Sequence, residues 1–169
     1  LDLGAGLGFF AYEAKLSGYS VSIADISKWA VNFVEKKYRI KGYVSDFSLE
    51  SLPKSKFGIL TLWDVIEHIN DPNLTFLALN RLIKKNGYVF MTTPNLDSID
   101  AKLFGSKWYG FKKIPEHVLY FSPKTIKILS SKYGFRGVAI KSWGFVRSLD
   151  FLAEKLYLYN SISGKLAKG

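Results

Sequence analysis

The chain has 169 residues, of which 48% are hydrophobic and 22% charged, a composition typical of one soluble globular domain. It has no run of eighteen or more apolar residues and no cysteine. These absences exclude a membrane span, disulfides, thiolate metal sites and a cysteine nucleophile. No signal-peptide pattern is visible, so a cytoplasmic location is the default expectation.

The formal net charge of +10 is unevenly distributed along the chain. Residues 1–85 carry 11 basic and 9 acidic side chains, whereas residues 86–169 carry 13 and 5. The excess of +8 in the second half indicates a surface that meets an anion, such as a nucleic acid, a phosphorylated substrate or a membrane surface. Because the lysines are scattered and no arginine-rich block exists, an ordinary lysine-coated surface explains the same pattern.

Short apolar runs alternate with helical patterns along most of the chain. In chain order the pattern predicts a strand over 1–3, a helix over 9–16, a strand over 19–24, a helix over 26–38, and strands over 42–45 and 58–63. It continues with a helix from Asp71-Pro72 to Asn86-Gly87, a strand over 88–93, a helix over 122–134 and a strand over 135–143. This alternation predicts an α/β fold with right-handed crossovers and a mostly parallel central sheet covered by helices on both faces.

Two regions do not fit this alternation. The stretch 95–121 interleaves aromatic residues with lysines, and long loops between a strand and the next helix usually cover a ligand. The segment 149–159 is amphipathic with helical spacing. No linker divides the chain, so we expect a single domain over 1–169. Since the chain opens within a motif and without Met, we expect it to be trimmed at its N-terminus, with a last strand absent or beyond Gly169.

The first strand runs into a glycine-rich turn that reads D-L-G-A-G-L-G. The glycines Gly4, Gly6 and Gly8 let the backbone turn sharply and approach a ligand, while Asp2 places a carboxylate beside the turn. A dinucleotide fingerprint would read G-x-G-x-x-G, and here the third glycine comes one residue early. In an open parallel sheet this first turn is the place where ligands bind.

With this motif at the end of its first strand, the chain resembles class I S-adenosylmethionine-dependent methyltransferases, whose first motif is D-x-G-x-G-x-G. The resemblance implies a three-layer α/β/α Rossmann-like fold that binds S-adenosylmethionine. Asp25 then corresponds to the acid that takes the ribose hydroxyls, and Asp46 to the residue that reads the adenine amino group, with Phe47 as a wall for the ring. The cofactor-binding residues implied are Asp2, Gly4, Gly6, Gly8, Asp25, Ile26, Asp46, Phe47, Trp63 and Asp64.

Three further segments, WDVIEHINDP, GYVFMTTPN and EHVLYFS, resemble the branch that contains ubiquinone-biosynthesis O-methyltransferases and small-RNA 2′-O-methyltransferases. The resemblance implies that His68 and His117 act as a base or orient the acceptor. It also implies a site for Mg²⁺ or a similar divalent cation made by Asp64, Glu67, His68 and His117. The relatives typically have Glu where this chain has Asp64, which shortens the reach by one methylene. Alternatively, Glu67 and His68 cap the next helix or close the cleft.

We therefore expect an S-adenosylmethionine-dependent methyltransferase that acts on oxygen of a small or anionic acceptor. Residues 95–121 would shape the acceptor pocket, and their lysines would favour an acidic or phosphorylated acceptor. The chain reads W-D-V-I after its fourth strand, where many amino-directed relatives have N/D-P-P-[YF].

Three alternatives stay open. An RNA 2′-O-methyltransferase would bind RNA with an affinity that falls steeply with salt. A nicotinamide-dependent oxidoreductase is disfavoured by the glycine spacing. A non-catalytic relative would keep the fold but bind the cofactor weakly or fail to turn over.

Overall fold

The computed structural model describes residues 1–46, 50, 52–108, 110–111 and 115–142. Phe47, Trp143 and the predicted helical segment 149–159 lie outside the described residues. Within the described part of the chain, no helix is long and apolar enough to cross a bilayer. The cytoplasmic location stays a prediction.

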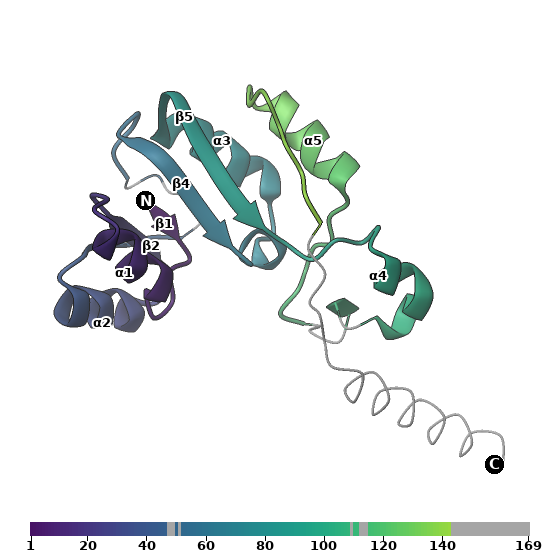
Figure 1. The fold of residues 1–169 in the computed structure, drawn as a ribbon, viewed down its shortest axis with the longest axis horizontal. Helices are drawn as coiled ribbons and strands as arrows, with labels where there is room; N and C mark the ends of the chain where they lie inside the picture. The colour runs from purple at the N-terminus through teal and green to yellow at the C-terminus, as the bar shows by residue number, and fades with distance from the viewer. Residues whose placement is uncertain (47–49, 51, 109, 112–114, 143–169) are drawn as a thin grey trace, which may run out of the picture.

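A five-stranded sheet in the order β3-β2-β1-β4-β5 forms the centre of the molecule (Figure 1). Its strands are β1 (Asp2–Leu3), β2 (Ser22–Asp25), β3 (Lys41–Val44), β4 (Phe57–Trp63) and β5 (Ile83–Thr92). Every neighbouring pair is parallel. The chain leaves β1 toward β2 and β3 and later returns to its other side as β4 and β5. The sheet therefore has its topological switch point between β1 and β4, where ligands bind in such folds.

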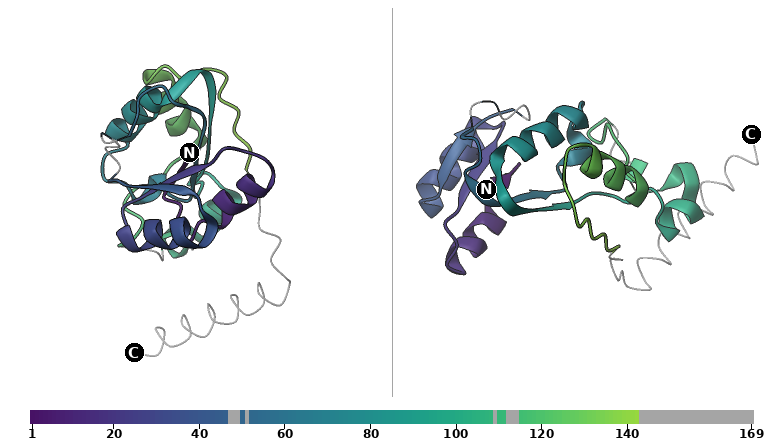
Figure 2. Two further views of the ribbon diagram at one scale, coloured as in Figure 1. Left: turned by 90° about the vertical axis from the view of Figure 1, so that its left-hand side faces the viewer. Right: turned by 90° about the horizontal axis from the view of Figure 1, so that it is seen from above.

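Helices flank the sheet on both sides, as the two additional views show (Figure 2). The helices are α1 (Phe9–Leu16), α2 (Lys28–Tyr38), α3 (Pro72–Leu82), α4 (Ile99–Phe104) and α5 (Pro123–Lys132), with short 3₁₀ turns η1 (Ile66–His68) and η2 (Gly105–Lys107). Of these, α4 lies beyond the ends of β4 and β5 and not against the sheet (Figure 1). Each β-α-β unit crosses from one strand to a parallel neighbour, as the alternating pattern predicted.

Two apolar clusters, one on each face of the sheet, hold these layers together. Ile23 of β2 points to the cluster formed with Ala11 of α1 and Val34 of α2. On the opposite face, Leu60 and Leu62 of β4 pack in one cluster with the inner side of α3. Because successive strand residues point to opposite faces, one strand serves both layers. The predicted three-layer α/β fold is confirmed.

Capping side chains mark where the helices begin, and α2 begins at Lys28, two residues after the predicted start. Ser27 accepts a hydrogen bond from the amide of Ala30 at the start of α2. Asp71 accepts one from the amide of Asn73 at the start of α3, 2.9 Å away. These N-caps satisfy amides that have no partner within the helix.

Two predicted boundaries are wrong. The helix expected to continue to Asn86-Gly87 ends at Leu82, and β5 begins at Ile83. Ile83 pairs with Phe57 and so belongs to β5. The strand then continues through Asn86, whose φ is +62°, and the register between β4 and β5 shifts between the pairs formed by Ile83 and Tyr88. An Asn-Gly pair ends a helix readily, but Asn also adopts this left-handed conformation inside an irregular strand.

The strand predicted over 135–143 is also wrong for its described residues. Residues 135–142 have no strand assignment. Gly137 has a φ of +67°, which interrupts the extended backbone that a strand requires. Apolar alternation therefore gave the wrong assignment where a glycine breaks the run.

Candidate functional site

The three glycines after β1 all adopt left-handed backbone conformations, with φ between +53° and +72°. A Cβ on Gly4 would lie 2.6 Å from Cγ2 of Val65, and one on Gly8 would lie 2.6 Å from Cγ2 of Val34. A Cβ on Gly6 would meet nothing within 4 Å. Gly4 and Gly8 are therefore required by close packing, whereas Gly6 exposes bare backbone to open space. That is the arrangement a ligand needs to approach the chain closely.

The carboxylate of Asp25 ties this glycine turn to the end of β2. Its Oδ2 accepts a hydrogen bond from the amide of Gly6 at 2.9 Å, and its Oδ1 accepts one from the amide of Ser27 at 2.8 Å. A carboxylate has about four lone-pair positions, so capacity remains for two further donors. The geometry fits the predicted role of Asp25 as acceptor for a pair of ribose hydroxyls.

Asp2 precedes the glycine turn and is buried, with only 3% of its surface exposed. Thr61 of β4 lies opposite Asp2 in the register, and its hydroxyl donates to Oδ1 of Asp2 at 2.6 Å. Burial raises the pKa of Asp2 to about 6, although the hydrogen bond from Thr61 opposes that rise. Asp2 is thus an interior residue of the site.

Asp46 comes two residues after β3, beside the end of β2. The amide of Ser45 donates to the carbonyl of Asp25 at 3.0 Å, which joins these two strand ends. Ile26 follows Asp25 directly, and its side chain is 65% exposed. The structure therefore brings Asp25, Ile26 and Asp46 to one edge of the sheet, as predicted.

Trp63 ends β4 at the same edge of the sheet, and Asp64 follows it. The ring of Trp63 meets that of Phe10 from α1 edge-on, with centroids 4.8 Å apart. Asp64 has a φ of +53°. Its amide donates to Oγ1 of Thr92, and the hydroxyl of Thr92 donates to Oδ1 of Asp64 at 2.8 Å. The first residue of the turn after β4 is thereby fixed to the end of β5.

Glu67, His68 and His117 form a compact group in which one ligand atom from each lies within 4.8 Å of the others. Glu67 is 1% exposed, and no described residue donates a hydrogen bond to either of its carboxylate oxygens. Burial raises the pKa of Glu67; a backbone amide and the nearby Thr93 hydroxyl oppose that rise, and the charge of Asp64 adds to it. A buried carboxylate without a donor is costly unless a cation or a proton accompanies it.

Hydrogen bonds attach the η1 turn to the segment that carries His117. The amides of Val118 and Leu119 both donate to the carbonyl of Glu67, at 2.9 and 3.1 Å. Nδ1 of His68 lies 2.8 Å from the carbonyl of Glu116. Because a carbonyl only accepts, Nδ1 carries a proton, and in the neutral imidazole Nε2 of His68 then has the lone pair.

The structure thus brings together three of the four residues predicted to bind a metal. Asp64 is not in the group, because Thr92 holds its carboxylate at the strand ends. The three residues present fit a divalent cation: one unpartnered carboxylate, one imidazole with an exposed lone pair and a second imidazole 4.8 Å away between ring centroids.

The described part of the stretch 95–121 contains α4 and η2, and its end is joined to Glu67 through Val118 and Leu119. Trp108 is 4% exposed, and its Nε1 donates to Oδ2 of Asp100 at 2.9 Å. Its ring packs edge-on against Phe111, with centroids 5.3 Å apart. Much of the aromatic content of this stretch therefore builds its own small core. Lys112 and Lys113 lie outside the described residues.

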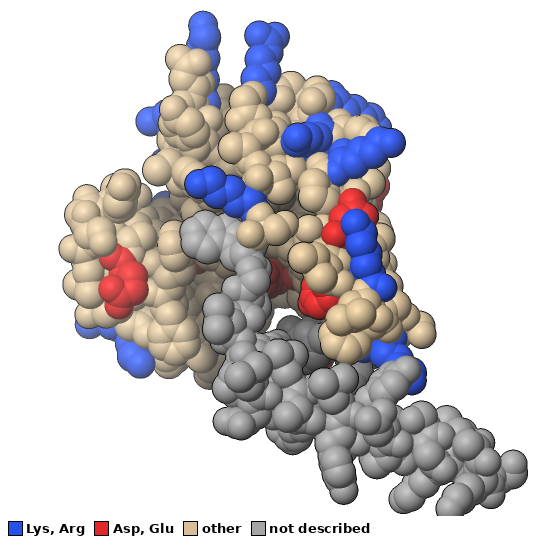
Figure 3. Space-filling model, turned by 45° about the vertical axis from the view of Figure 1, so that its right-hand side comes forward, with Lys and Arg blue, Asp and Glu red and all other residues tan. Residues whose placement is uncertain are grey.

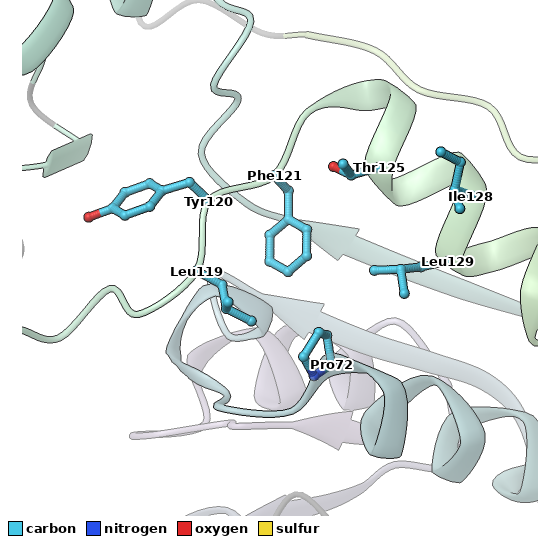
Figure 4. A pocket seen from close by; sticks show the side chains of 7 residues that line it. All are labelled: Pro72, Leu119, Tyr120, Phe121, Thr125, Ile128 and Leu129. Atoms are coloured by element: carbon cyan, nitrogen blue, oxygen red, sulfur yellow. The ribbon is translucent and has the colours of Figure 1, made fainter.

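A separate apolar pocket of about 240 Å³ lies between α5 and the start of α3 (Figure 4). It is lined by Pro72, Leu119, Tyr120, Phe121, Thr125, Ile128 and Leu129. None of these residues was predicted to bind the cofactor or a metal. The pocket therefore does not coincide with the predicted site.

Sequence reasoning missed Thr61 and Thr92, which orient Asp2 and Asp64. Each threonine stands near the carboxyl end of a strand, beside an acid supplied by the neighbouring strand or the turn after it. Threonine is common in strands, so these two threonines can be recognised as partners of the acids only once the strand register is known.

The comparisons with known proteins agree with this geometry. The family model for a methyltransferase domain matches residues 1–140. Ubiquinone biosynthesis O-methyltransferase of Thiobacillus denitrificans is 31% identical over 101 residues, which cover 56% of this chain and 44% of that protein. The enzyme of the same name from Pelagibacter ubique is 33% identical over 99 residues, covering 56% and 41%. The chain spans less than half the length of these curated relatives.

Solved methyltransferase structures share the fold. A SAM-dependent methyltransferase from Archaeoglobus fulgidus aligns with a TM-score of 0.67 and 23% identity, covering 98% of this chain and 77% of that one. Phosphoethanolamine N-methyltransferase 2 of Haemonchus contortus, solved with S-adenosyl-L-methionine, aligns with a TM-score of 0.64 and 22% identity, covering 99% and 40%. With its matching family model, its parallel sheet and its glycine turn, the chain belongs to the methyltransferase domain family, among the class I S-adenosylmethionine-dependent methyltransferases.

Proposed function

We propose that this chain binds S-adenosylmethionine at the carboxyl ends of β1, β2 and β3 and transfers its methyl group to an oxygen of a small acceptor. The observation that carries the proposal is the open backbone at Gly6, tied by its amide to the carboxylate of Asp25. This pair offers an approach for the cofactor and an acceptor for its ribose hydroxyls in one place.

For methyl transfer, the main task of the protein is to align the methyl donor with the acceptor atom. The acceptor oxygen forms a bond to the methyl carbon while the carbon–sulfur bond breaks, so the sulfonium becomes a neutral thioether. Holding the two reactants in line can contribute about 7–11 kcal/mol, and no nucleophilic side chain is needed. The acceptor hydroxyl loses its proton, and Nε2 of His68 offers a lone pair that can take it when no cation occupies that nitrogen.

Oxygen is the acceptor atom that the relatives favour. The curated relatives that match over half the chain are ubiquinone biosynthesis O-methyltransferases by name. The turn after β4 reads W-D-V-I, without the tetrapeptide found in many amino-directed relatives. Both features support oxygen as the atom that is methylated.

The proposal includes a divalent cation such as Mg²⁺, which Glu67, His68 and His117 would bind. When bound, the cation would act as a Lewis acid that lowers the pKa of the acceptor hydroxyl. The buried carboxylate of Glu67 would supply the negative charge, and Nε2 of His68 a neutral ligand.

The first test is a calorimetric titration with S-adenosylhomocysteine. Wild-type protein is expected to bind it, and Asp25→Ala to lose most of the affinity, because the ribose acceptor and the tie to Gly6 disappear together. Glu13→Ala, which removes an exposed acid from α1, serves as the control and is expected to bind like wild type. NADH is expected not to compete. A folded protein that prefers NADH, or that binds neither ligand, would contradict the proposal.

The cation is tested separately by titrating Mn²⁺ into the protein and following free Mn²⁺ by electron paramagnetic resonance. Wild type is expected to take up one ion, and Glu67→Gln to bind it at least tenfold more weakly, since the carboxylate charge is lost. Asp64→Asn is expected to change Mn²⁺ affinity little, because Asp64 lies outside the group. Unchanged uptake in Glu67→Gln would show that the Glu67 carboxylate does not hold the cation; a helix-capping role is already excluded for it, because Asp71 caps α3.

An anionic acceptor is a further part of the proposal. Replacing Lys112 and Lys113 with Ala is expected to weaken acceptor binding and to reduce its dependence on salt, because each lysine would contribute a screened attraction. Equal affinity and equal salt dependence in this double variant would count against an acidic or phosphorylated acceptor.

A further inference from the structure

The backbone position of Asp64 does not by itself fix the orientation of its side chain. Its φ of +53° is a left-handed conformation that Asp tolerates better than most residues. It is the first residue after β4, directly before the turn that carries Glu67. A side chain at such an exposed strand end samples several rotamers unless a neighbour holds one of them.

Thr92 fixes the orientation of the Asp64 side chain through two hydrogen bonds. The amide of Asp64 donates to Oγ1 of Thr92 at 2.9 Å, and the hydroxyl of Thr92 donates in turn to Oδ1 of Asp64 at 2.8 Å. Thr92 is the last residue of β5 and pairs with Trp63 in the parallel register. Because threonine is β-branched and stiff at χ1, its hydroxyl is directed by the strand that carries it.

One carboxylate oxygen of Asp64 therefore remains available. Oδ1 is engaged with Thr92, while Oδ2 accepts no hydrogen bond from any residue in the described part of the chain. Val65, the residue after Asp64, packs against Gly4 of the glycine turn. A fixed, singly engaged carboxylate next to that contact matches a cationic ligand group. S-Adenosylmethionine presents two such groups, its ammonium and its sulfonium.

We propose that Thr92 is a positioning residue that holds the Asp64 carboxylate toward the cationic end of the cofactor. The inference rests on the proposed function, because it takes S-adenosylmethionine as the ligand. It assigns to Thr92 no contact with the reacting atoms. Its effect reaches the cofactor only through Asp64.

The test compares two replacements of Thr92 by titration with S-adenosylhomocysteine, which keeps the ammonium group. Thr92→Val preserves the shape of the side chain and removes both hydrogen bonds, and we expect it to weaken binding about tenfold. Thr92→Ser keeps the hydroxyl, and we expect it to bind within about twofold of wild type. Thr92 is exposed, so both variants are expected to melt within about 3 °C of wild type.

Two further variants separate positioning from general destabilisation. Thr125→Val removes a similarly exposed threonine hydroxyl, at the start of α5, and is expected to leave binding unchanged. Asp64→Asn keeps an amide oxygen but removes the charge, and we expect it to weaken binding about as much as Thr92→Val. The double variant Thr92→Val with Asp64→Asn is expected to bind no more weakly than Asp64→Asn alone. Once residue 64 is uncharged, its orientation no longer contributes to the attraction of a cationic group.

Three outcomes would overturn the inference while leaving the proposed function intact: wild-type affinity in Thr92→Val, no recovery in Thr92→Ser, or additive losses in the double variant. A wild-type protein that is folded and binds no S-adenosylhomocysteine would overturn the proposed function itself, and the inference with it.

Discussion

The three glycines that follow β1 differ in what surrounds them, and alanine replacements should separate their roles. In Gly4→Ala the new Cβ meets Val65 at 2.6 Å in a backbone with φ +67°, so we expect the free energy of unfolding to fall by about 2–4 kcal/mol. In Gly6→Ala the methyl group enters open space, and the expected loss is about 1 kcal/mol from the left-handed backbone alone.

Ligand binding should rank these two variants in the opposite order. The methyl group of Gly6→Ala occupies the space through which the cofactor approaches, so this stable variant is expected to lose S-adenosylhomocysteine binding. Urea unfolding and calorimetry on the same samples check both quantities. A stable Gly6→Ala variant with wild-type affinity would show that the ligand lies elsewhere.

The buried carboxylate of Asp2 predicts how stability depends on pH. Its pKa rises from an ordinary value of 3.8 to about 6 on folding, so the folded state holds the proton more tightly than the unfolded chain. This contribution to stability is complete below pH 3.8 and is lost as the pH rises through about 6. The difference between the two pKa values corresponds to about 3 kcal/mol.

Comparison with Asp2→Asn isolates this single group. Between pH 4 and pH 7.5 the wild type is expected to lose up to about 3 kcal/mol of unfolding free energy relative to the variant. Urea unfolding at several pH values measures the difference. A difference that stays constant over this range would show that Asp2 does not titrate differently in the two states.

Among single residues, the sequence predicted the positions of acids and glycines better than their partners. Asp25 and Asp46 could be placed at strand ends because short strands end at recognisable turns. The pairing of Asp64 with Thr92 depends on the register between β4 and β5, which neither segment encodes alone. The roles of the predicted site residues in binding remain predictions.

Among the helices and strands, local signals located starts better than ends. Ser27, Asp71 and Ser122 cap helices with side chains that can be read directly from the sequence. The boundary between α3 and β5 depends instead on which residue pairs first with β4. The helix α4 within 95–121 was not predicted, since six residues are too few to show a helical period.

A hydrogen bond from Trp108 to Asp100 holds α4 against the segment that follows it, and mutation can test its contribution. Trp108→Phe removes the hydrogen bond from Nε1 to Asp100 and some buried volume, so we expect a loss of about 1–2 kcal/mol in unfolding free energy. Asp100→Asn keeps an oxygen that can accept the bond and should cost less than about 0.5 kcal/mol. Thermal melts of both variants check the ranking, and equal losses would contradict it.

At the scale of the whole molecule, one part of the chain carries basic residues without any acidic ones. Residues 72–96 and 117–142 contain eight Lys or Arg residues and no Asp or Glu. Figure 3 shows Lys and Arg side chains gathered over the upper part of the molecule. These residues belong to α3, β5, α5 and the segments beside them, on the side of β1 opposite β2 and β3.

This asymmetry predicts salt-dependent binding of single-stranded RNA. We expect an oligonucleotide to bind weakly at 50 mM salt and at least tenfold more weakly at 200 mM, because bound counterions are released on association. Lys124→Glu with Lys127→Glu should lower RNA affinity and leave S-adenosylhomocysteine binding unchanged. Fluorescence anisotropy checks this, and RNA affinity that is insensitive to salt and to charge reversal would argue against an electrostatic surface.

The position of β1 in the middle of the sheet also constrains the order of folding. Asp2 pairs with Thr61, 59 residues later, so the central strand cannot complete its pairing until β4 has been made. Such distant pairings close large loops and slow the formation of the sheet. During synthesis the glycine turn and Asp25 therefore leave the ribosome well before β4 can hold β1. The binding site is expected to assemble late, and an isolated fragment that ends before β4 should not bind the cofactor.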